Sequence, residues 1–290
     1  MSNVGDVSPL KMAACLAPGL LLIALLFGGP LLWSLLGSFG LAQAGGSFTL
    51  AHYAEVFTRP ALQRGLGVSV YYGVAPVLPS LLVSIALALL MRRHFWGRRL
   101  FNGLYKLPMA VPGIIAALVV LTLVERGGFV ARLLAPLAPF GIALPRLVRD
   151  DWGLGVILTT AWKQVPFMTL VIGGALAAIS EDIIAASRSL GANRWRTLLH
   201  VELPLAMPGI SAAVLLSFIG SMGSFAIPDL VGPASPRPLA VHMVAEFGNG
   251  NFNLVYAIGM VLSAFAVAVL LGYYALSARA QRLLAGGRNA

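Results

Sequence analysis

Residues 65–91 read GLGVSVYYGVAPVLPSLLVSIALALLM, a run of 27 positions without Asp, Glu, Lys or Arg. About 20 mostly apolar residues are enough for a helix to cross the hydrocarbon core of a bilayer, where a helix satisfies its own backbone hydrogen bonds. The run therefore predicts a membrane-spanning helix. Its apolar residues are continuous and do not alternate with polar ones, which argues against a strand of a transmembrane barrel.

Five further apolar stretches have a similar length, and they cover residues 13–36, 100–124, 153–179, 205–230 and 254–277. The composition agrees, because 59% of the 290 residues are hydrophobic and only 10% are charged, against about 25% charged in an ordinary soluble domain. The sequence thus predicts an all-α polytopic membrane protein with six transmembrane helices.

The first stretch is interpreted as an uncleaved span. No charged side chain occurs from residue 12 to residue 54, whereas the apolar part of a secretory signal is about 7–15 residues long. The single cysteine, Cys15, lies within this stretch, so no disulfide framework and no zinc-ligand spacing is present in the sequence.

Basic residues set the expected orientation. Residues 92–106 carry five Lys or Arg side chains and no acid, and three arginines follow the last span: Arg279, Arg282 and Arg288. Cytoplasmic loops of membrane proteins are enriched in Lys and Arg. We therefore expect both termini in the cytoplasm (N-in, C-in). The net charge of +10 resides in these loops and forms no single basic face, so it does not indicate nucleic-acid binding.

The longest connection expected in the cytoplasm is residues 180–204, SEDIIAASRSLGANRWRTLLHVELP. Ser180 is typical of a helix start, Gly191 of a left-handed helix end, and a second short helix is expected to begin near Ala192. The apolar residues of that second helix share one face: Trp195, Leu198 and Leu199. This face is equally consistent with lying on the membrane surface and with contacting a partner protein.

The segment resembles the cytoplasmic signature loop of ABC importer permeases, whose pattern is Glu-Ala-Ala, three residues, Gly, nine residues, Ile, one residue, Leu-Pro. We assign Ile184 to the position of the pattern's glutamate, and Val201 replaces the isoleucine. The resemblance implies a loop that fits a groove on a cytoplasmic ATPase, through Ala185, Ala186, Gly191, Ala192, Arg194, Trp195, Val201, Leu203 and Pro204. A rigid helix held between Gly191 and Pro204 is expected to transmit motion of the ATPase to the neighbouring spans.

The resemblance further implies a type I importer permease of the bacterial inner membrane, in the polyamine, aminoethylphosphonate and ferric-iron branch. Its permease domain would cover residues 65–278, preceded by a tail, the first span and an external loop (1–64) and followed by a cytoplasmic tail (279–290). The implied partners are a cytoplasmic ABC ATPase dimer, a second permease subunit, identical or homologous, a periplasmic or extracellular binding protein, and membrane lipid, with no nucleic acid. A polyamine or a related organic amine or aminophosphonate ranks first as cargo, ahead of ferric iron, another inorganic ion and thiamine.

The sequence predicts no enzyme activity in this chain. Lys11, Lys106 and Lys163 are not followed by Ser or Thr, so no phosphate-binding loop occurs, and the four histidines lack metal-ligand spacing. No metal and no cofactor is expected here, and ATP and Mg²⁺ are expected at the partner ATPase.

Polar residues within the spans are candidates for the translocation path or its gate. Lys163 and Gln164 either face the path or, for Lys163, extend to the membrane surface or to a carboxylate of the partner subunit. Phe225, Pro228 and Asp229 either form the external gate, as a similar run does in related permeases, or lie in an interfacial turn, which is the simpler interpretation. Glu246 is expected in a solvated loop, and a short helix is expected around residues 129–137.

Two other classes of protein stay open. A secondary transporter driven by an ion gradient typically has internal repeats and acids at mid-membrane, which this chain does not clearly show. A membrane scaffold whose basic loops bind anionic lipid leaves the signature loop unexplained.

Overall fold

The computed structural model describes residues 9–43, 45–125, 127–136 and 146–286, and the regular elements within these ranges are all helices. The first half of the chain forms α1 (Pro9–Ile23), the π-helical turn η1 (Ala24–Gly28), α2 (Gly29–Ser38), α3 (Ala51–Thr58), α4 (Pro60–Val74), α5 (Val77–Met91), α6 (Arg98–Leu104), α7 (Leu107–Ala110), α8 (Gly113–Val124) and α9 (Phe129–Leu134). The second half forms α10 (Leu154–Ala177), α11 (Glu181–Ser189), α12 (Arg194–Thr197), the π-helical turn η3 (Leu198–Glu202), α13 (Leu203–Met222), α14 (Ala226–Val231), α15 (Leu239–Gly248) and α16 (Phe252–Gly286).

Six helical stretches of the described chain are long and apolar enough to cross a bilayer: Met12–Ser38, Pro60–Met91, Gly113–Leu134, Leu154–Ala177, Arg194–Met222 and Phe252–Ala275. The six-span, all-helical expectation is confirmed. The first, second, fourth and sixth stretches agree with the predicted spans to within a few residues, whereas the third and fifth differ.

The third span was predicted wrongly at 100–124. The structure divides this stretch into α6, α7 and α8, and Val111 between α7 and α8 has extended backbone. Pro112 causes this break, because its ring disfavours helical backbone in the preceding residue. The apolar stretch long enough to span therefore begins at Gly113 and continues to Leu134. The short helix expected around residues 129–137 is α9, although residues 137–145 lie outside the described part.

The fifth span was predicted at 205–230, but α13 ends at Met222. Gly223 follows as its C-cap, and a separate helix, α14, begins at Ala226 with Pro228 in its first turn. A glycine at a helix end and a proline at a helix start favour such an interruption. At the other end this helix is longer than predicted, because α12, η3 and α13 run together from Arg194.

The core lies where α10 packs between α5 and α13. Its most buried side chains come from these helices and from α4 and α16, and they include Leu62, Met168, Ile172, Leu176 and Ile258. Gly209 permits the close approach of α13 to α10, since a Cβ atom at this position would lie 2.4 Å from the Cβ of Ala175.

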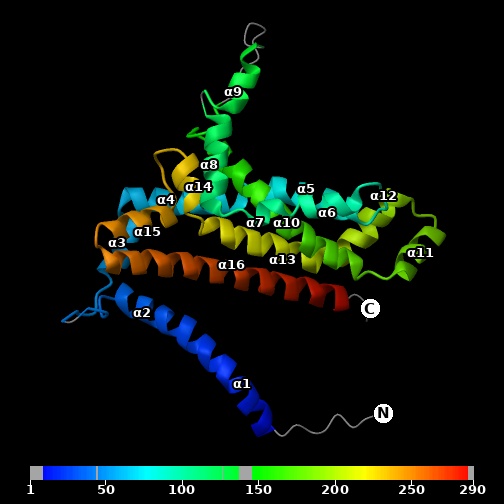
Figure 1. Cartoon of the computed structure of the whole chain (residues 1–290). Helices are drawn as coiled ribbons and strands as arrows, with labels where there is room; N and C mark the ends of the chain where they lie inside the picture. The colour runs from blue at the N-terminus through cyan, green and yellow to red at the C-terminus, as the bar shows by residue number, and fades with distance from the viewer. Residues whose placement is uncertain (1–8, 44, 126, 137–145, 287–290) are drawn as a thin grey trace.

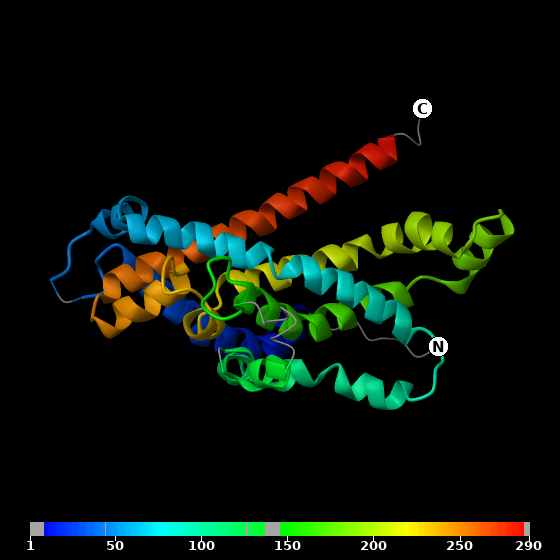
Figure 2. The same cartoon turned by 90° about the horizontal axis from the view of Figure 1, so that it is seen from above.

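The bundle has two distinct ends (Figures 1 and 2). One end carries α11, α12, the loop between α5 and α6, and the end of α16. The other end carries α3 and α15. Helices α1 and α2 diverge from the bundle on one side and α8 projects from it on the other (Figure 1). The basic segment 92–106 and the segment 180–204 thus lie at the same end, as their predicted cytoplasmic location requires.

Candidate functional site

Segment 180–204 folds as a helical hairpin that projects from the end of the bundle (Figures 1 and 2). Its first helix, α11, ends at Ser189, and Gly191 in the following turn has a left-handed φ of +85°. The N–H of Gly191 donates to the carbonyl of Arg188 at 2.9 Å, and the N–H of Ala192 donates to that of Ser187 at 3.1 Å. These two bonds satisfy carbonyls that a helix end leaves free. The left-handed turn expected at Gly191 is present.

The two starts of the hairpin are capped differently from expectation. Ser180 precedes α11 at the N-cap position, but its side chain makes no capping hydrogen bond. The helix start is instead favoured by the acidic Glu181 and Asp182 in its first turn. Asn193 caps α12, with its Oδ1 accepting from the N–H of Arg196 at 2.9 Å. An asparagine before a helical run is a recognisable sequence signal, although this cap was not among the predicted features.

A side-chain bond holds the two helices of the hairpin together. The hydroxyls of Ser187 on α11 and Thr197 on α12 lie 2.9 Å apart, and Thr197 is buried. Ile184, also buried, packs on the inner side of α11. The turn at Gly191 therefore has one arrangement fixed by contacts on both sides.

The helix after the turn does not stop at Pro204. Pro204 lies in the first turn of α13, and the helical backbone continues from Arg194 to Met222. Proline removes a backbone N–H from a helix, and the preceding turn is π-helical, with the N–H of Leu203 donating to the carbonyl of Leu198. The expectation of a short helix held at Pro204 is therefore wrong, and the second helix of the hairpin is the start of the fifth span.

The assignment of Ile184 to the pattern's glutamate was off by one position. Three residues separate Ser187 from Gly191, so Glu-Ala-Ala falls on Ala185, Ala186 and Ser187. Burial agrees, since Ala185 is exposed whereas Ile184 is buried. The chain thus has an alanine where the pattern has an exposed acid.

The remaining residues expected to meet an ATPase lie on the hairpin as follows. Six of them are exposed: Ala185, Ala186, Gly191, Arg194, Trp195 and Pro204. The other three are half-buried: Ala192, Val201 and Leu203. The largest apolar surfaces are at the turn and just after it, where Leu190 is 89% exposed and Trp195 71%. Leu198, expected on the same face as Trp195, is half-buried.

An ion pair joins this hairpin to the second span. Arg92, directly after α5, donates to the carboxylate of Glu202 in η3. Glu202 is 8% exposed, so its charge needs this partner. Glu202 was not among the residues predicted to have a role. Its spacing gave no signal, because its partner is 110 residues away.

Lys163 and Gln164 occupy different surroundings on α10. The Nζ of Lys163 donates to the carbonyl oxygens of Val111 and, at 3.3 Å, of Pro108, at the break between α7 and α8. Within the described part of the chain, no acidic side chain forms an ion pair with Lys163. That Lys163 lines the path stays a prediction.

Gln164 joins three helices. Its Nε2 donates to the carbonyl of Ser217 at 3.0 Å and to the hydroxyl of Ser221 on α13, and its Oε1 lies 3.2 Å from the hydroxyl of Ser80 on α5. These contacts satisfy the amide within the bundle. The structure thus gives Gln164 a role in packing, and its predicted role in the path stays untested.

The gate candidates lie at and after the start of α14. Phe225 precedes this helix and is half-buried, Pro228 is buried, and Asp229 is exposed in its first turn. Helix α14 packs against α8. No hydrogen bond among the described residues links these three to Lys163 or Gln164, so the two groups of candidates are separate.

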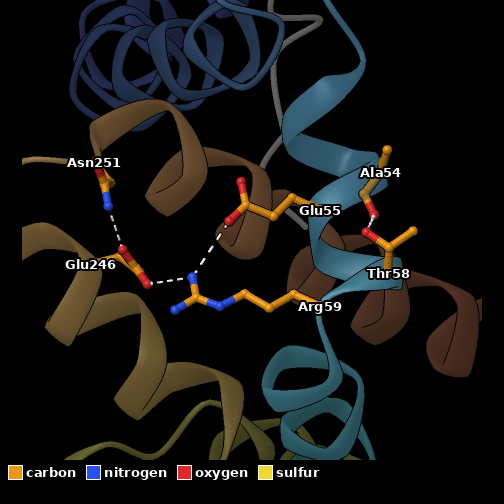
Figure 3. A network of polar contacts seen from close by, with 6 residues as sticks. All are labelled: Ala54, Glu55, Thr58, Arg59, Glu246 and Asn251. Carbon is orange, nitrogen blue, oxygen red and sulfur yellow. Dashed lines mark hydrogen bonds and ion pairs between the residues drawn. The ribbon is translucent and has the colours of Figure 1, made fainter.

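Glu246 was expected in a solvated loop, but it is 5% exposed at the opposite end of the bundle. Figure 3 shows the guanidinium of Arg59 between two carboxylates, 2.8 Å from Glu246 and 3.4 Å from Glu55. Asn251 also donates to Glu246, at 2.6 Å. The hydrogen bond from Asn251, followed by Arg59, holds the pKa of Glu246 below its ordinary value, although burial acts in the other direction.

His242, one turn before Glu246 on α15, lies in the same cluster. Burial lowers the pKa of His242, and the charges of Arg59 and Arg237 lower it further, against the opposing effect of Glu246. The cluster therefore holds a neutral imidazole beside an ionised carboxylate at neutral pH. Together these contacts fix α3, α15 and α16 at this end of the molecule.

Within the described residues, no three His, Cys, Asp or Glu side chains lie close enough to hold a metal ion.

Comparison with known proteins gives a clear match. Residues 80–285 match the family model described as binding-protein-dependent transport system inner membrane component.

Relatives support the same assignment. The chain is 27% identical over 231 residues to the molybdenum transport system permease protein ModB of Haemophilus influenzae, covering 78% of this chain and 97% of that protein. It is 31% identical over 176 residues to the sulfate transport system permease protein CysT of Escherichia coli, covering 60% of this chain and 61% of that protein.

A solved structure shares the fold. One chain of a bacterial alginate ABC transporter, crystallised in complex with its alginate pentasaccharide-bound periplasmic protein, matches with a TM-score of 0.76. The match covers 92% of this chain and 94% of that chain at 17% sequence identity. The arrangement of helices described above is thus one already seen in a transporter.

Proposed function

The chain belongs to the family of binding-protein-dependent transport inner membrane components and is a permease subunit of an ABC importer; from this premise we propose how it works and with which partners. The hairpin of α11 and α12 meets a separate cytoplasmic ATPase dimer, which binds ATP and Mg²⁺. A second permease subunit and an external binding protein complete the importer. The membrane is a bacterial inner membrane, and residues 65–278 form the permease domain, flanked by 1–64 and 279–290.

One observation carries this proposal, namely that the exposed turn at Gly191 leads directly into a membrane-spanning helix. The ion pair between Arg92 and Glu202 adds a second connection, to α5. Closure of the ATPase pair around bound ATP would displace the hairpin. Because α10 precedes it and α13 continues it, the displacement would reach two spans at once and drive alternating access.

The cargo is a small solute. The names of the two relatives favour a small oxyanion, since one serves molybdenum and the other sulfate transport. They give no support to the polyamine expected from the sequence. Ferric iron, thiamine and aminophosphonate stay compatible with the same permease role.

Reconstitution tests the function and the cargo together. The chain is placed in liposomes with its cognate ATPase and binding protein, and uptake of labelled molybdate, sulfate and spermidine is measured with and without ATP. We expect uptake of one of these or of another small solute only with ATP and both partners. Uptake driven by an ion gradient in liposomes that contain the chain alone would establish a secondary transporter instead.

A scaffold is distinguished by a variant of the turn. Gly191→Pro removes a backbone N–H that bonds to Arg188 and is incompatible with the φ of +85°. We expect it to abolish ATP-dependent uptake at unchanged protein level. Normal uptake in this variant favours a scaffold, because it shows that the loop is not needed for transport.

A further inference from the structure

A cavity of about 300 Å³ lies between the end of α5, the helix α11 and the segment α12–η3. The helices that line it lie at the end of the bundle where the hairpin projects (Figures 1 and 2). Its lining combines apolar and charged side chains, and the charged ones are Arg92, Arg93, Glu181, Arg188, Arg194 and Glu202. Three separate parts of the sequence thus contribute arginines to one cavity.

The charges in this cavity do not balance. Arg92 and Glu202 neutralise each other in their ion pair. Arg93, Arg188 and Arg194 then face a single further acid, and none of these three arginines forms an ion pair in the part of the chain that the structure describes. A guanidinium stays charged at all physiological pH values. The cavity therefore carries a net positive charge that attracts carboxylate or another anion.

The walls of the cavity favour a protein partner over a free ion. Three apolar side chains of the hairpin line it, namely the buried Ile184, the half-buried Leu198 and the largely exposed Trp195. Arginine and tryptophan beside apolar contact area are typical of the centres of protein interfaces, where they carry much of the binding energy. A small hydrated anion would use the guanidinium groups but gain nothing from the tryptophan.

We propose that this cavity receives an acidic segment of the ATPase, whose Asp or Glu side chains pair with Arg188 and Arg194. The proposal rests on the permease function proposed above and names the chemistry of its cytoplasmic partner. The permease supplies the positive charges of the contact. Arg93 extends the positive surface to the end of α5, so the acidic segment touches both the hairpin and the second span.

Charge reversal tests this contact. The permease is purified in nanodiscs, and its dissociation constant for the cognate ATPase is measured for wild type, Arg188→Glu, Arg194→Glu and the double variant. Arg99→Glu is the matched control, because Arg99 on α6 lies at the same end of the bundle and is exposed, but it belongs neither to the hairpin nor to the lining of the cavity. We expect each cavity variant to weaken binding tenfold or more, and the control to stay within twofold of wild type.

Salt dependence and folding provide independent readouts. Binding of wild type should weaken as salt rises, and the double variant should lose most of this dependence, because the paired charges are gone. Thermal unfolding of each variant in nanodiscs shows that the fold is kept. Should one reversal destabilise the chain, the milder Arg188→Gln and Arg194→Gln are measured in its place.

Several outcomes overturn the proposal. Unchanged affinity in the double variant does so, and so does equal weakening in Arg99→Glu, which would indicate long-range attraction without a specific contact. Phosphate or anionic-lipid nanodiscs that stabilise wild type but not the cavity variants, with ATPase affinity unaffected, would identify a small-anion or headgroup site instead. If wild type itself binds no ATPase, the proposed function fails and not merely this contact.

Discussion

Substituting Gly191 by alanine isolates the backbone cost of the turn between α11 and α12. A Cβ atom at this position would meet no heavy atom within 4 Å, so no side-chain clash is expected. The φ of +85° is nevertheless in the left-handed region, where an L-residue costs about 1–2 kcal/mol. A cost of this size corresponds to a shift of about 5–30-fold away from the arrangement seen here.

The dissociation constant for the ATPase measures this shift, because we expect the ATPase to bind the hairpin only when the turn has the arrangement seen here. We expect Gly191→Ala to weaken binding by about 5–30-fold, and Gly191→Asn to weaken it less, because asparagine adopts left-handed backbone more readily. Gly97 offers a matched control, since its φ is +82° and its Cβ position is equally open, but it is the N-cap of α6 and lies outside the hairpin.

The reasoning is refuted by either of two results. Binding of Gly191→Ala within twofold of wild type would show that the turn tolerates other arrangements. An equal loss in Gly97→Ala would show that backbone strain anywhere in the cytoplasmic loops acts in the same way. The unfolding temperature of both variants should fall only slightly, because neither glycine lies in the core.

Three further predictions concern packing, pH and charge. Gly209→Ala should lower the free energy of unfolding by about 1–3 kcal/mol through overpacking against α10, whereas Gly174→Ala, with nothing within 4 Å, should not; equal unfolding temperatures would contradict this. The pKa of Glu246 is lower in the folded state than in the unfolded state, so the unfolded state binds more protons at acidic pH. The stability that the ionised carboxylate contributes is therefore complete above the unfolded pKa of about 4.3 and is lost as pH falls below it. Glu246→Gln should thus flatten the acid limb of a plot of unfolding temperature against pH, and an unchanged limb would exclude this origin. Glu202→Gln should leave Arg92 without its partner, and a double-mutant cycle with Arg92→Gln should give a coupling of about 0.5–3 kcal/mol in unfolding experiments; a coupling near zero would mean that solvent screens the pair.

The sequence predicts the class of fold well because lipid imposes a simple length requirement. Uncharged runs such as 65–91 can be recognised without any knowledge of packing. The errors arose where length alone is ambiguous. The run 100–124 is mostly apolar, yet the backbone preference of Val111 before Pro112 breaks the helix there. In the run 205–230 the helix ends instead at the C-cap Gly223.

Features of the candidate site divide by whether their cause is local. The left-handed Gly191 follows from nearby sequence, as does the missed cap at Asn193. The burial of Glu246 does not, because its partner Arg59 is 187 residues away, and the same holds for the pair of Arg92 with Glu202. No local pattern reports which distant charge will be adjacent, so both acids escaped prediction.

The unbroken helix from Arg194 to Met222 has 29 residues, and at about 1.5 Å per residue it is about 43 Å long. Such a helix is expected to move as one rigid element, since compressing or bending it would strain many backbone hydrogen bonds together. The π turn widens it without severing it. In the proposed importer the point of bending would then lie at Gly223, at the end of this helix far from the ATPase, and we expect substitutions that alter the timing of opening to concentrate there.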